Sequence, residues 1–216
     1  MELAELRNLI KSRRSIRQWQ DKGVPEGLLT EAIELATWAP NGGNQQNWRF
    51  YVIINRGVMK AIADAVQASA DQIAVWAEAG KFEGVAEWRG RASFFRNAPA
   101  AIVVAVSNYQ SLADQVLAAG EKIYPRASEM RRWRNVSNSR IQSAAAAIAY
   151  LLLILHQMGL GAVWMTGPMQ AKGEIERLLK VSPELDVVAF IPVGYPAESP
   201  APKGRRPVRE VCEVVR

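Results

Sequence analysis

"SRIQSAAAAIAYLLLILHQMGLGAVWMTGP", residues 139–168, contains the longest apolar run of the chain. Residues 144–155 are twelve consecutive apolar residues, well short of the roughly 20 that a helix needs to cross a bilayer. The run is apolar on every face, so it predicts a helix surrounded by protein at the centre of the core. Gly159 or Gly161 should end this helix. The following "AVWMT" should then form a short buried strand.

The segments that precede and follow this helix show both helical and strand patterns. Apolar residues at helical spacing begin at Leu3, and a second helix should begin at Pro25 and stop near Ala39, because the residue before Pro40 disfavours helix. Three runs read as strands, the second of them buried on both faces: "RFYVII" (49–54), "AAIVVAV" (100–106) and "VVAFIPVGY" (187–195). Residues 172–181, "KGEIERLLKV", predict an amphipathic helix.

Two regions are less regular. Residues 57–96 contain helical stretches with Trp76 and Trp88, whereas residues 107–137 are more polar, and we interpret the latter as a mobile or substrate-facing segment. Prolines at 196, 200, 202 and 207 predict an extended C-terminal arm. Such an arm needs a surface to lie on, and a second subunit can provide one. Since no repeat or linker divides the chain, we treat residues 1–216 as a single domain.

The composition restricts the chemistry. The chain has 216 residues, of which 49 % are hydrophobic and 22 % charged, so it is long enough and apolar enough to fold around a core. His156 is the only histidine and Cys212 the only cysteine, so histidine-based metal clusters and catalytic triads are poorly supported. Neither a Rossmann G-x-G-x-x-G nor a P-loop pattern occurs. An organic cofactor is therefore the natural source of reactivity.

The compartment and the charge can be judged from the same composition. A single cysteine allows no intrachain disulfide, and the start of the sequence lacks the unbroken apolar core of a signal peptide, so we expect a cytoplasmic protein. The chain has 27 basic and 21 acidic residues, a net charge of +6 that indicates attraction to phosphate in some form.

Two basic clusters lie at opposite ends of the chain. "RRSIR", residues 13–17, offers guanidinium groups and a hydroxyl, and Arg13, Ser15 and Arg17 share a face if the stretch is extended. "KGRRP", residues 203–207, adds further cations on the arm. Each cluster alone also fits a solvated basic helix end or tail. Phosphate is the one partner that both clusters can bind at once.

Two further stretches have polar or small residues where a ligand can approach. "APNGGNQQNW", residues 39–48, is rich in amides, and if Asn44 and Gln46 alternate as in a strand, their side chains can face a heterocycle together. A turn that satisfies its own backbone is the alternative. In "WMTGP", residues 164–168, Thr166 and Gly167 follow the short strand, where a backbone N–H can point at a ligand. An ordinary exit from a strand into a turn is the alternative there.

These four stretches, in this order, resemble the nitroreductase-like family of FMN-dependent flavoproteins. The marks are "RRSIR", the pattern AP-x-x-x-N-x-Q-x-W, the helix ending in "GLGAVWMTGP", and "VGYP" followed by "KGRRP". The resemblance covers nearly the whole chain, with residues 60–135 least recognisable. It implies an α+β fold, a three-layer sandwich in which helices flank a mostly antiparallel central sheet. It further implies an intertwined homodimer with an extended C-terminal arm.

The resemblance also implies a cofactor, its reductant and the residues that bind the cofactor. FMN would sit at the subunit interface, with NADH or NADPH as reductant and chemistry carried by the flavin rather than by a catalytic side chain. The implied cofactor-binding residues are Arg13, Arg14, Ser15, Arg17, Pro40, Asn41, Gly42, Asn44, Gln46, Met165, Thr166, Gly167, Lys203 and Arg205. The two basic clusters would hold the phosphate, the amide loop would reach the flavin from the partner subunit, and Thr166 and Gly167 would lie near flavin N5. No metal is implied.

The reaction implied by the resemblance is reduction of nitroaromatic, quinone or related electrophilic acceptors by ping-pong hydride transfer. Specialised reactions of the same fold remain alternatives, namely reductive dehalogenation or oxygen-dependent fragmentation of reduced FMN by a lower-ligand synthase. A basic nucleic-acid-binding module is an alternative of another class, although no such motif is present, and we expect neither nucleic acid nor membrane as a partner. Two departures from the family pattern, Asn41 for Ser and Asn47 for Pro, leave the reaction type open.

Overall fold

The structure is a computed structural model that describes residues 2–108 and 110–216. Its α-helices are α1 (Leu3–Ser12), α2 (Glu26–Ala36), α3 (Arg56–Ala74), α4 (Val85–Arg91), α5 (Leu112–Gly120), α6 (Pro125–Ser137), α7 (Ser139–Gln157) and α8 (Lys172–Leu179). Its strands are β1 (Trp48–Ile53), β2 (Ala100–Ser107), β3 (Gly161–Ala162) and β4 (Leu185–Gly194). Short 3₁₀ turns lie at Gly42–Asn44, Ala77–Lys81, Phe94–Asn97, Gly167–Ala171 and Val208–Glu210.

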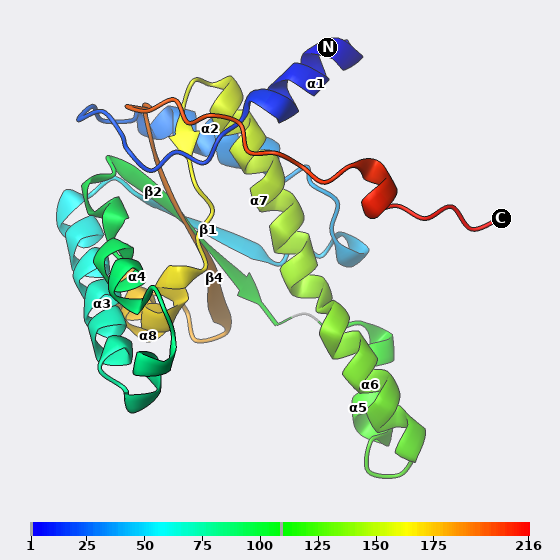
Figure 1. The fold of residues 1–216 in the computed structure, drawn as a ribbon. Coiled ribbons are helices and arrows are strands. Elements are labelled where there is room, and N and C mark those ends of the chain that lie inside the picture. Colours follow the sequence, from blue (N-terminus) through cyan, green and yellow to red (C-terminus); the bar gives the residue numbers. More distant parts are fainter. Residues whose placement is uncertain (1, 109) are drawn as a thin grey trace.

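The four strands form one sheet in the order β1-β2-β4-β3, and each neighbouring pair is antiparallel. Helices α2 and α7 cover one face and helices α3 and α8 the other (Figure 1). Strand β2 shows why both faces are covered, because Ile102 and Val104 pack in the α2/α7 core while Ala101 and Val103 pack in the α3/α8 core. The α+β three-layer arrangement predicted from the sequence is confirmed.

Helix α7 differs from its prediction in one respect. It ends at Gln157 and Gly159 has φ 76°, so glycine stops the helix as expected. Only one face, which includes Ala144, Leu151 and Leu155, is buried within the chain. The other face leaves Ala149 and Tyr150 exposed, so the prediction of a helix surrounded on all sides is wrong for the single chain. The sheet and helix α2 cover the buried face of this helix within the chain.

The N-terminal segment after α1 lies along the free edge of β3. Ser15 bridges Ala162 in parallel, and the Ile16 N–H donates to the Ala162 carbonyl over 3.1 Å. This approach depends on Gly161, because a Cβ at that position would lie 2.6 Å from Ile16 Cγ1. The sequence "RRSIR" is therefore extended and held against the sheet, as the sharing of one face by alternate residues requires.

Strand β3 is shorter than the predicted "AVWMT". It pairs with β4 only at residues 161 and 162, and pairing resumes as an isolated bridge between Met165 and Phe190. Pro192 on β4 explains the interruption, because it accepts from the Val163 N–H but has no N–H of its own to return.

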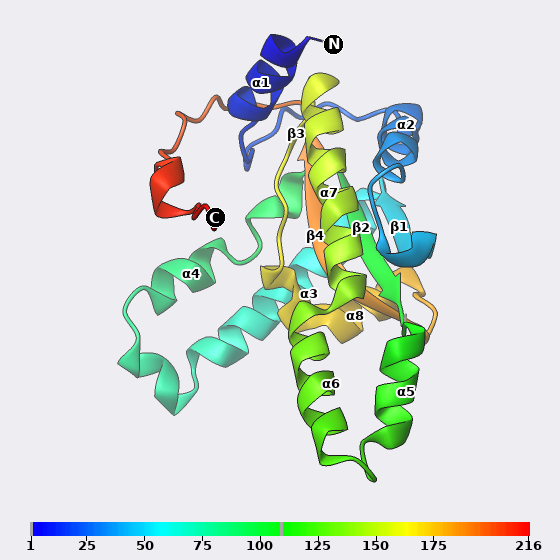
Figure 2. The ribbon, with the colours of Figure 1, turned by 90° about the vertical axis from the view of Figure 1, so that its right-hand side faces the viewer.

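Helices α5 and α6 form a hairpin that projects beyond the sheet (Figure 2). Two ion pairs join α6 to α5 and the end of α5: Arg134 with Asp114, and Arg131 with Glu121. The sequence pattern predicted no helix boundaries here, and position 109 lies outside the described residues. That residues 107–137 are a mobile or substrate-facing segment stays a prediction.

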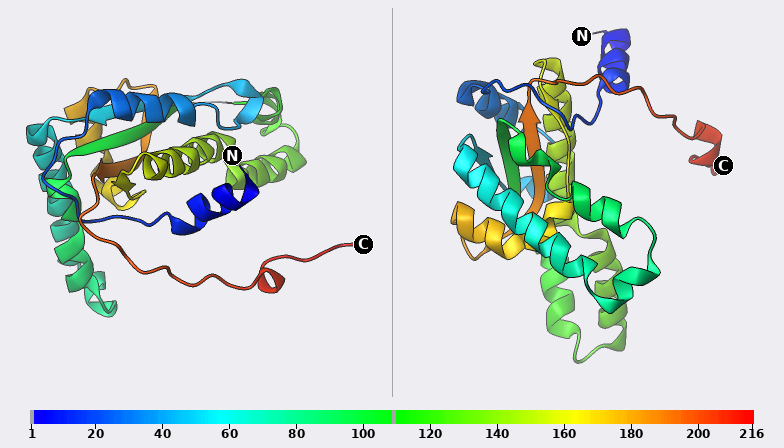
Figure 3. Two further views of the ribbon diagram at one scale, coloured as in Figure 1. Left: turned by 90° about the horizontal axis from the view of Figure 1, so that it is seen from above. Right: turned by 60° about the vertical axis from the view of Figure 1, so that its left-hand side comes forward.

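The C-terminal arm follows strand β4, which ends at Gly194, and runs in an extended conformation until its end projects away from the body of the molecule (Figure 3). Residues 201–216 are exposed throughout, and Val208 and Val215 are 73 % and 90 % exposed. The prediction of an extended arm is confirmed apart from one 3₁₀ turn at Val208–Glu210.

One helical stretch, Pro125–Gln157, is long and apolar enough to cross a membrane by length and composition alone. It consists of α6 and α7, which meet at Asn138 with φ 37°, and the apolar half packs on the sheet. The same test is passed by core helices, so this is weak evidence for a span.

Candidate cofactor site

A strongly basic cavity of about 490 Å³ lies where the N-terminal segment meets the C-terminal arm, a volume within the usual range of small-molecule sites. The arm contributes Lys203 and Arg205, and the segment contributes Arg13, Ser15 and Arg17. Lys11 and Arg14 complete a lining that contains six cationic side chains and no carboxylate. The structure thus brings together the two basic clusters that the sequence placed at opposite ends of the chain.

The electrostatics of this cavity show how closely the cations are packed. Burial lowers the pKa of Arg13, and the nearby charges of Arg14 and Arg205 lower it further. Arg14 donates from its guanidinium to the carbonyls of Lys11 and Arg13 at 2.7 and 2.9 Å, whereas its Nε is buried with no partner among the described residues. Like charges held this close favour an anion between them.

Glu198 ties the arm to the basic segment. Its carboxylate accepts from the backbone N–H of Arg17 and from that of Gln18, the latter at 3.1 Å. The Ala197 N–H also donates to the Gln18 carbonyl over 3.0 Å. These bonds fix the path of the arm as it leaves β4, so that Lys203 arrives beside Arg13.

A second cavity, of about 690 Å³, shares Arg17 with the first. Its walls include Trp88 from α4, Phe94, and Met165 and Gly167 from the turn after β3. Trp19 stacks on Phe94 with the ring centroids 6.3 Å apart, which backs this aromatic wall. Arg17 therefore lines both a basic cavity and one with aromatic walls, an arrangement suited to an anion joined to a ring system.

The turn "WMTGP" lies on this second cavity. Met165 exchanges both backbone hydrogen bonds with Phe190, each of 3.0 Å, which fixes the turn to β4. Thr166 and Gly167 begin a 3₁₀ turn, and within residues 2–108 and 110–216 their N–H groups have no hydrogen-bond partner. The backbone donors expected from the sequence are thus available next to the cavity.

The amide loop does not have the geometry expected from its sequence. Asn44 and Gln46 have φ of 51° and 46°, so they are left-handed residues in and after a 3₁₀ turn rather than alternating strand residues. Asn41 accepts from the Gln46 N–H over 2.9 Å and donates to the Ala39 carbonyl over 3.3 Å. These internal bonds favour the tight-turn alternative for the Asn41 side chain.

The amide loop also lies far from the basic cavity of its own chain. The Gly42 N–H donates to Ser143 Oγ in the first turns of α7, whereas Ser12, beside Arg13, hydrogen-bonds His156 in the last turn over 2.9 Å. Thirteen residues of α-helix separate these two anchor points, a distance of about 20 Å. Lys203 and Arg205 therefore join Arg13 within one chain, whereas Pro40, Asn41, Gly42, Asn44 and Gln46 do not.

Sequence reasoning missed several residues of the second cavity, among them Trp88, Arg91, Phe94 and Glu198. Residues 77–95 are spread over a 3₁₀ turn and α4, and no periodic pattern connects them to the basic clusters. Glu198 has backbone N–H groups as its partners, which no sequence pattern displays.

One protein-family model matches most of this chain. The model of the Nitroreductase family matches residues 10–195. The chain belongs to the nitroreductase family. The family recognised from the four motifs is confirmed, and with it the prediction of an FMN-dependent oxidoreductase at the level of the family.

Named relatives and solved structures agree with this membership. The chain is 29 % identical over 216 residues to an NADH dehydrogenase of Thermus thermophilus, covering 92 % of this chain and 90 % of the relative. It is 27 % identical over 214 residues to an iodotyrosine deiodinase of Thermotoga neapolitana, covering 95 % of each. A crystal structure of a BluB-like flavoprotein from Clostridium difficile superposes with a TM-score of 0.86 at 27 % identity, over 100 % of both chains.

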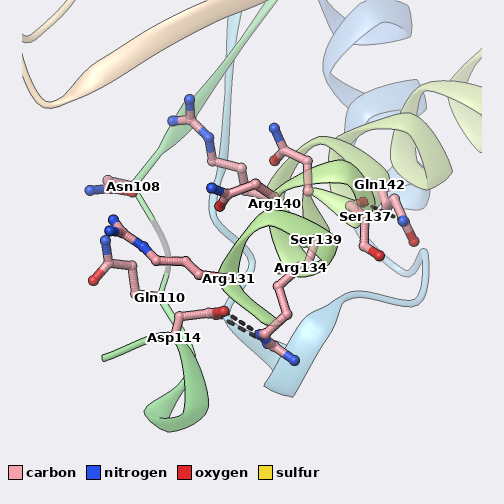
Figure 4. Close-up of a pocket in the computed structure, with 11 residues that line it drawn as sticks. Asn108, Gln110, Asp114, Arg131, Arg134, Ser137, Ser139, Arg140 and Gln142 are labelled. Atoms are coloured by element: carbon pink, nitrogen blue, oxygen red, sulfur yellow. Dashed lines mark hydrogen bonds and ion pairs between the residues drawn. The ribbon is translucent and has the colours of Figure 1, made fainter. Parts of the chain in front are cut away.

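A third cavity, of about 440 Å³, lies at the base of the hairpin of this nitroreductase-family protein (Figure 4). It is polar, and it is lined by Arg131, Arg134 and Arg140 together with Asp114. Each of these arginines has a carboxylate partner: Glu121, Asp114 and Asp186 respectively. Hydrogen bonds from Arg134 and Ser111 hold the pKa of Asp114 far below its usual range. None of the cofactor-binding residues implied by the family resemblance lines this cavity.

Proposed function

We propose that this protein is an FMN-dependent NAD(P)H oxidoreductase that reduces nitroaromatic, quinone or related electrophilic acceptors by a ping-pong reaction. Residues 1–216 form its single FMN-binding domain. The observation that carries the proposal is the pair of cavities joined at Arg17, one strongly basic and one with aromatic walls. Their order matches a phosphate at one end of a ligand and a flat ring at the other.

The residues present fit the phosphate of FMN. Six cationic side chains line the basic cavity without a carboxylate, and the buried Nε of Arg14 has no partner among the described residues. Burial lowers the pKa of Arg13, and the charges of Arg14 and Arg205 lower it further. A dianionic phosphate would relieve this repulsion between the cations. Ser15 adds a hydroxyl donor on the same lining.

The ring of the cofactor is assigned to the second cavity. Arg17 stands at the junction and can donate to the pyrimidine side, while the N–H groups of Thr166 and Gly167 offer donors to a ring nitrogen. When bound, FMN supplies the redox chemistry by accepting hydride from NADH or NADPH and passing electrons to the acceptor. Phe94 and Met165 exclude water from one side of this cavity.

A homodimer supplies the remaining residues. The amide loop lies about 20 Å along α7 from the basic cavity of its own chain, so it can contribute to a flavin site only by reaching that of a partner. The unburied face of α7, with Ala146, Ala149, Tyr150 and Leu153 at helical spacing, is an apolar stripe on which a second α7 can pack. The exposed valines of the arm fit the same assembly.

The test is the affinity for FMN. Purified protein should be yellow with a flavin absorption spectrum, and Arg13→Ala should weaken FMN binding roughly 10- to 100-fold, because one charge-assisted contact contributes about 1.5 to 3 kcal/mol. Arg7→Ala is the matched control, since it removes the same charge from α1 at a residue that does not line the cavity. A colourless protein that also fails to bind added FMN would refute the proposal.

Reductive dehalogenation is the second candidate, favoured by the iodotyrosine deiodinase relative that covers 95 % of this chain. Holoenzyme reduced with dithionite and given 3-iodo-L-tyrosine should release iodide if this reaction is the native one. The same enzyme with NADH and a nitroaromatic or quinone should turn over faster if the leading proposal is correct. With oxygen as the sole acceptor, fragmentation of the flavin would point instead to the oxygen-dependent alternative.

A further inference from the structure

We propose that Arg91, at the rim of the second cavity, makes the enzyme selective for aromatic acceptors that carry a negative charge. This inference rests on the proposed function, because it takes the second cavity as the place where the acceptor meets the flavin. It goes further by naming a charge on the acceptor and the residue that recognises it.

The second cavity is larger than a single ring requires, and its lining includes aromatic, apolar and charged side chains. It measures about 690 Å³ and extends from Met165 and Gly167, beside the sheet, outward to Trp88 and Arg91 on α4. Trp88 lines this part of the cavity and remains 40 % exposed. Phe94 is the second aromatic residue of the lining, and two aromatic side chains favour flat aromatic molecules over aliphatic ones.

The charges of the lining single out Arg91. Among the residues that line this cavity, Arg17, Arg91 and Glu198 are the ones with a formal charge. Glu198 accepts from the backbone N–H groups of Arg17 and Gln18, and Arg17 is shared with the basic cavity assigned to the cofactor. Arg91 is therefore the cation of the lining that neither the arm nor the cofactor engages.

Arg91 has a partner that it can exchange at small cost. It pairs with Glu87 one turn earlier on α4, at 2.6 Å, with side chains 75 % and 63 % exposed. Such solvent-exposed pairs contribute little, because water screens them and holding two long side chains costs entropy. A carboxylate or sulfonate on a bound ring, with a bidentate fit to the guanidinium, can take the place of Glu87.

Arg89, two residues away, is the natural contrast. Its Nε donates to Asp71 on α3 over 2.6 Å, and its carbonyl accepts from Gln67, which also bonds Asp71. Arg89 therefore joins α4 to α3 and does not line the cavity. It provides a variant with the same loss of charge from the same helix.

The experiment measures binding to the oxidised FMN-loaded enzyme without reductant, following the flavin spectrum during titration with 4-nitrobenzoate and with nitrobenzene. The two probes share the nitroaromatic ring and differ in the carboxylate. Arg91→Met should change the ratio of the two dissociation constants roughly 2- to 5-fold against 4-nitrobenzoate, the effect of losing one solvent-exposed ion pair. Arg89→Met should leave this ratio as in the parent protein.

A second variant predicts the opposite sign. Glu87→Gln removes the competing carboxylate while preserving side-chain shape, so 4-nitrobenzoate should bind more tightly relative to nitrobenzene. Trp88→Leu should weaken both probes together, because the indole contacts the ring they share. Opposite shifts from two neighbours on one helix are difficult to produce by a general loss of folding.

Three results would overturn the inference. One is a ratio that does not change in Arg91→Met, another is an equal change in Arg89→Met, and the third is a loss of FMN affinity in Arg91→Met that accounts for the whole effect. Failure of the proposed function is distinguishable from all three, because parent protein without a flavin spectrum would leave no holoenzyme to titrate. Yellow parent protein with an unchanged ratio refutes the charge selectivity alone.

Discussion

His156 lies at the end of α7, where its imidazole hydrogen-bonds Ser12 next to the basic cavity. Burial lowers the pKa of His156, and the charges of Arg13 and Arg14 lower it further. The folded protein thus holds this imidazole neutral at a pH where the unfolded chain, with a pKa near the ordinary 6.5, already binds a proton. The charges of Arg13 and Arg14 repel a protonated His156, whereas the neutral imidazole carries no charge for them to repel.

The sign of the resulting pH dependence follows from proton binding. The unfolded state binds more protons between the lowered pKa and 6.5, so the free energy of unfolding should rise with pH through this window and fall below it. His156→Gln keeps a polar side chain but does not titrate, and it should flatten this rise. The measurement is urea unfolding of the FMN-free protein between pH 5.5 and 7.5. An equal slope in the variant would contradict the prediction.

Individual residues of the site were predictable where one chemical property decided their place. Arg13, Arg17, Lys203 and Arg205 meet at one cavity because all need an anion, which the sequence indicated. Asn44 and Gln46 were misjudged as strand residues, because a tight turn with left-handed backbone overrode their alternation. Glu198 was missed because its partners are backbone N–H groups, which no sequence pattern displays.

At the scale of an element, the close contact between the N-terminal segment and β3 sets the position of the basic cluster. A Cβ at Gly161 would lie 2.6 and 2.8 Å from two atoms of Ile16, so Gly161→Ala must push the segment away from the sheet. Overpacking of this kind typically costs about 1 to 3 kcal/mol of stability. We expect Gly161→Ala to unfold at lower temperature and to bind FMN more weakly, as measured by calorimetry and by flavin titration.

The matched control for this variant is Gly173→Ala. Gly173 is in α8 and a Cβ there would meet no atom within 4 Å, so alanine should be neutral or slightly stabilising. A Gly161→Ala protein that matched this control in both stability and FMN affinity would show that the segment need not lie against β3.

Most elements of this fold were predictable, and the exceptions have particular physical causes. The strongly periodic helices α1 and α8 and the apolar strands β1, β2 and β4 agree with their sequence patterns. Strand β3 ended early because Pro192 on its partner strand lacks an N–H, a fact about a residue distant in sequence. Helix α6 is polar and largely exposed, so it lacks the apolar stripe that reveals a helix from sequence.

At the scale of the whole molecule, the arm is predicted to serve both the phosphate site and the dimer. Removing residues 199–216 deletes Lys203 and Arg205 and the exposed valines, but retains Glu198. Because residues 201–216 are exposed in the single chain, the remaining chain should fold. We expect it to bind FMN weakly and to sediment as a monomer in analytical ultracentrifugation.

A full-length double variant, Lys203→Gln with Arg205→Gln, separates the two roles of the arm. It keeps the valines and loses the two charges, so it should remain dimeric while its FMN affinity falls. A truncated protein that stayed dimeric with full FMN affinity would leave the arm without either role.

The overall layering was accessible from the sequence, whereas the surroundings of α7 were not. An all-apolar helix indicates that something covers every face, but it does not say whether the cover belongs to the same chain. Within one chain the sheet and α2 cover Leu151 and Leu155 and leave Tyr150 44 % exposed. A second subunit is proposed to cover the exposed face of α7, and the sequence of one chain does not show which subunit covers a helix.

The separation of the amide loop from the basic cavity along α7 has a consequence for how the enzyme responds to dilution. The proposed flavin site takes the amide loop from one chain and the basic cavity from the other. FMN binding and dimer formation are therefore thermodynamically coupled. By mass action, each tenfold fall in protein concentration below the dimer dissociation constant should lower the apparent flavin affinity, and added FMN should reassemble the subunits. Bound FMN would then stabilise the dimer as well as serve as its redox centre.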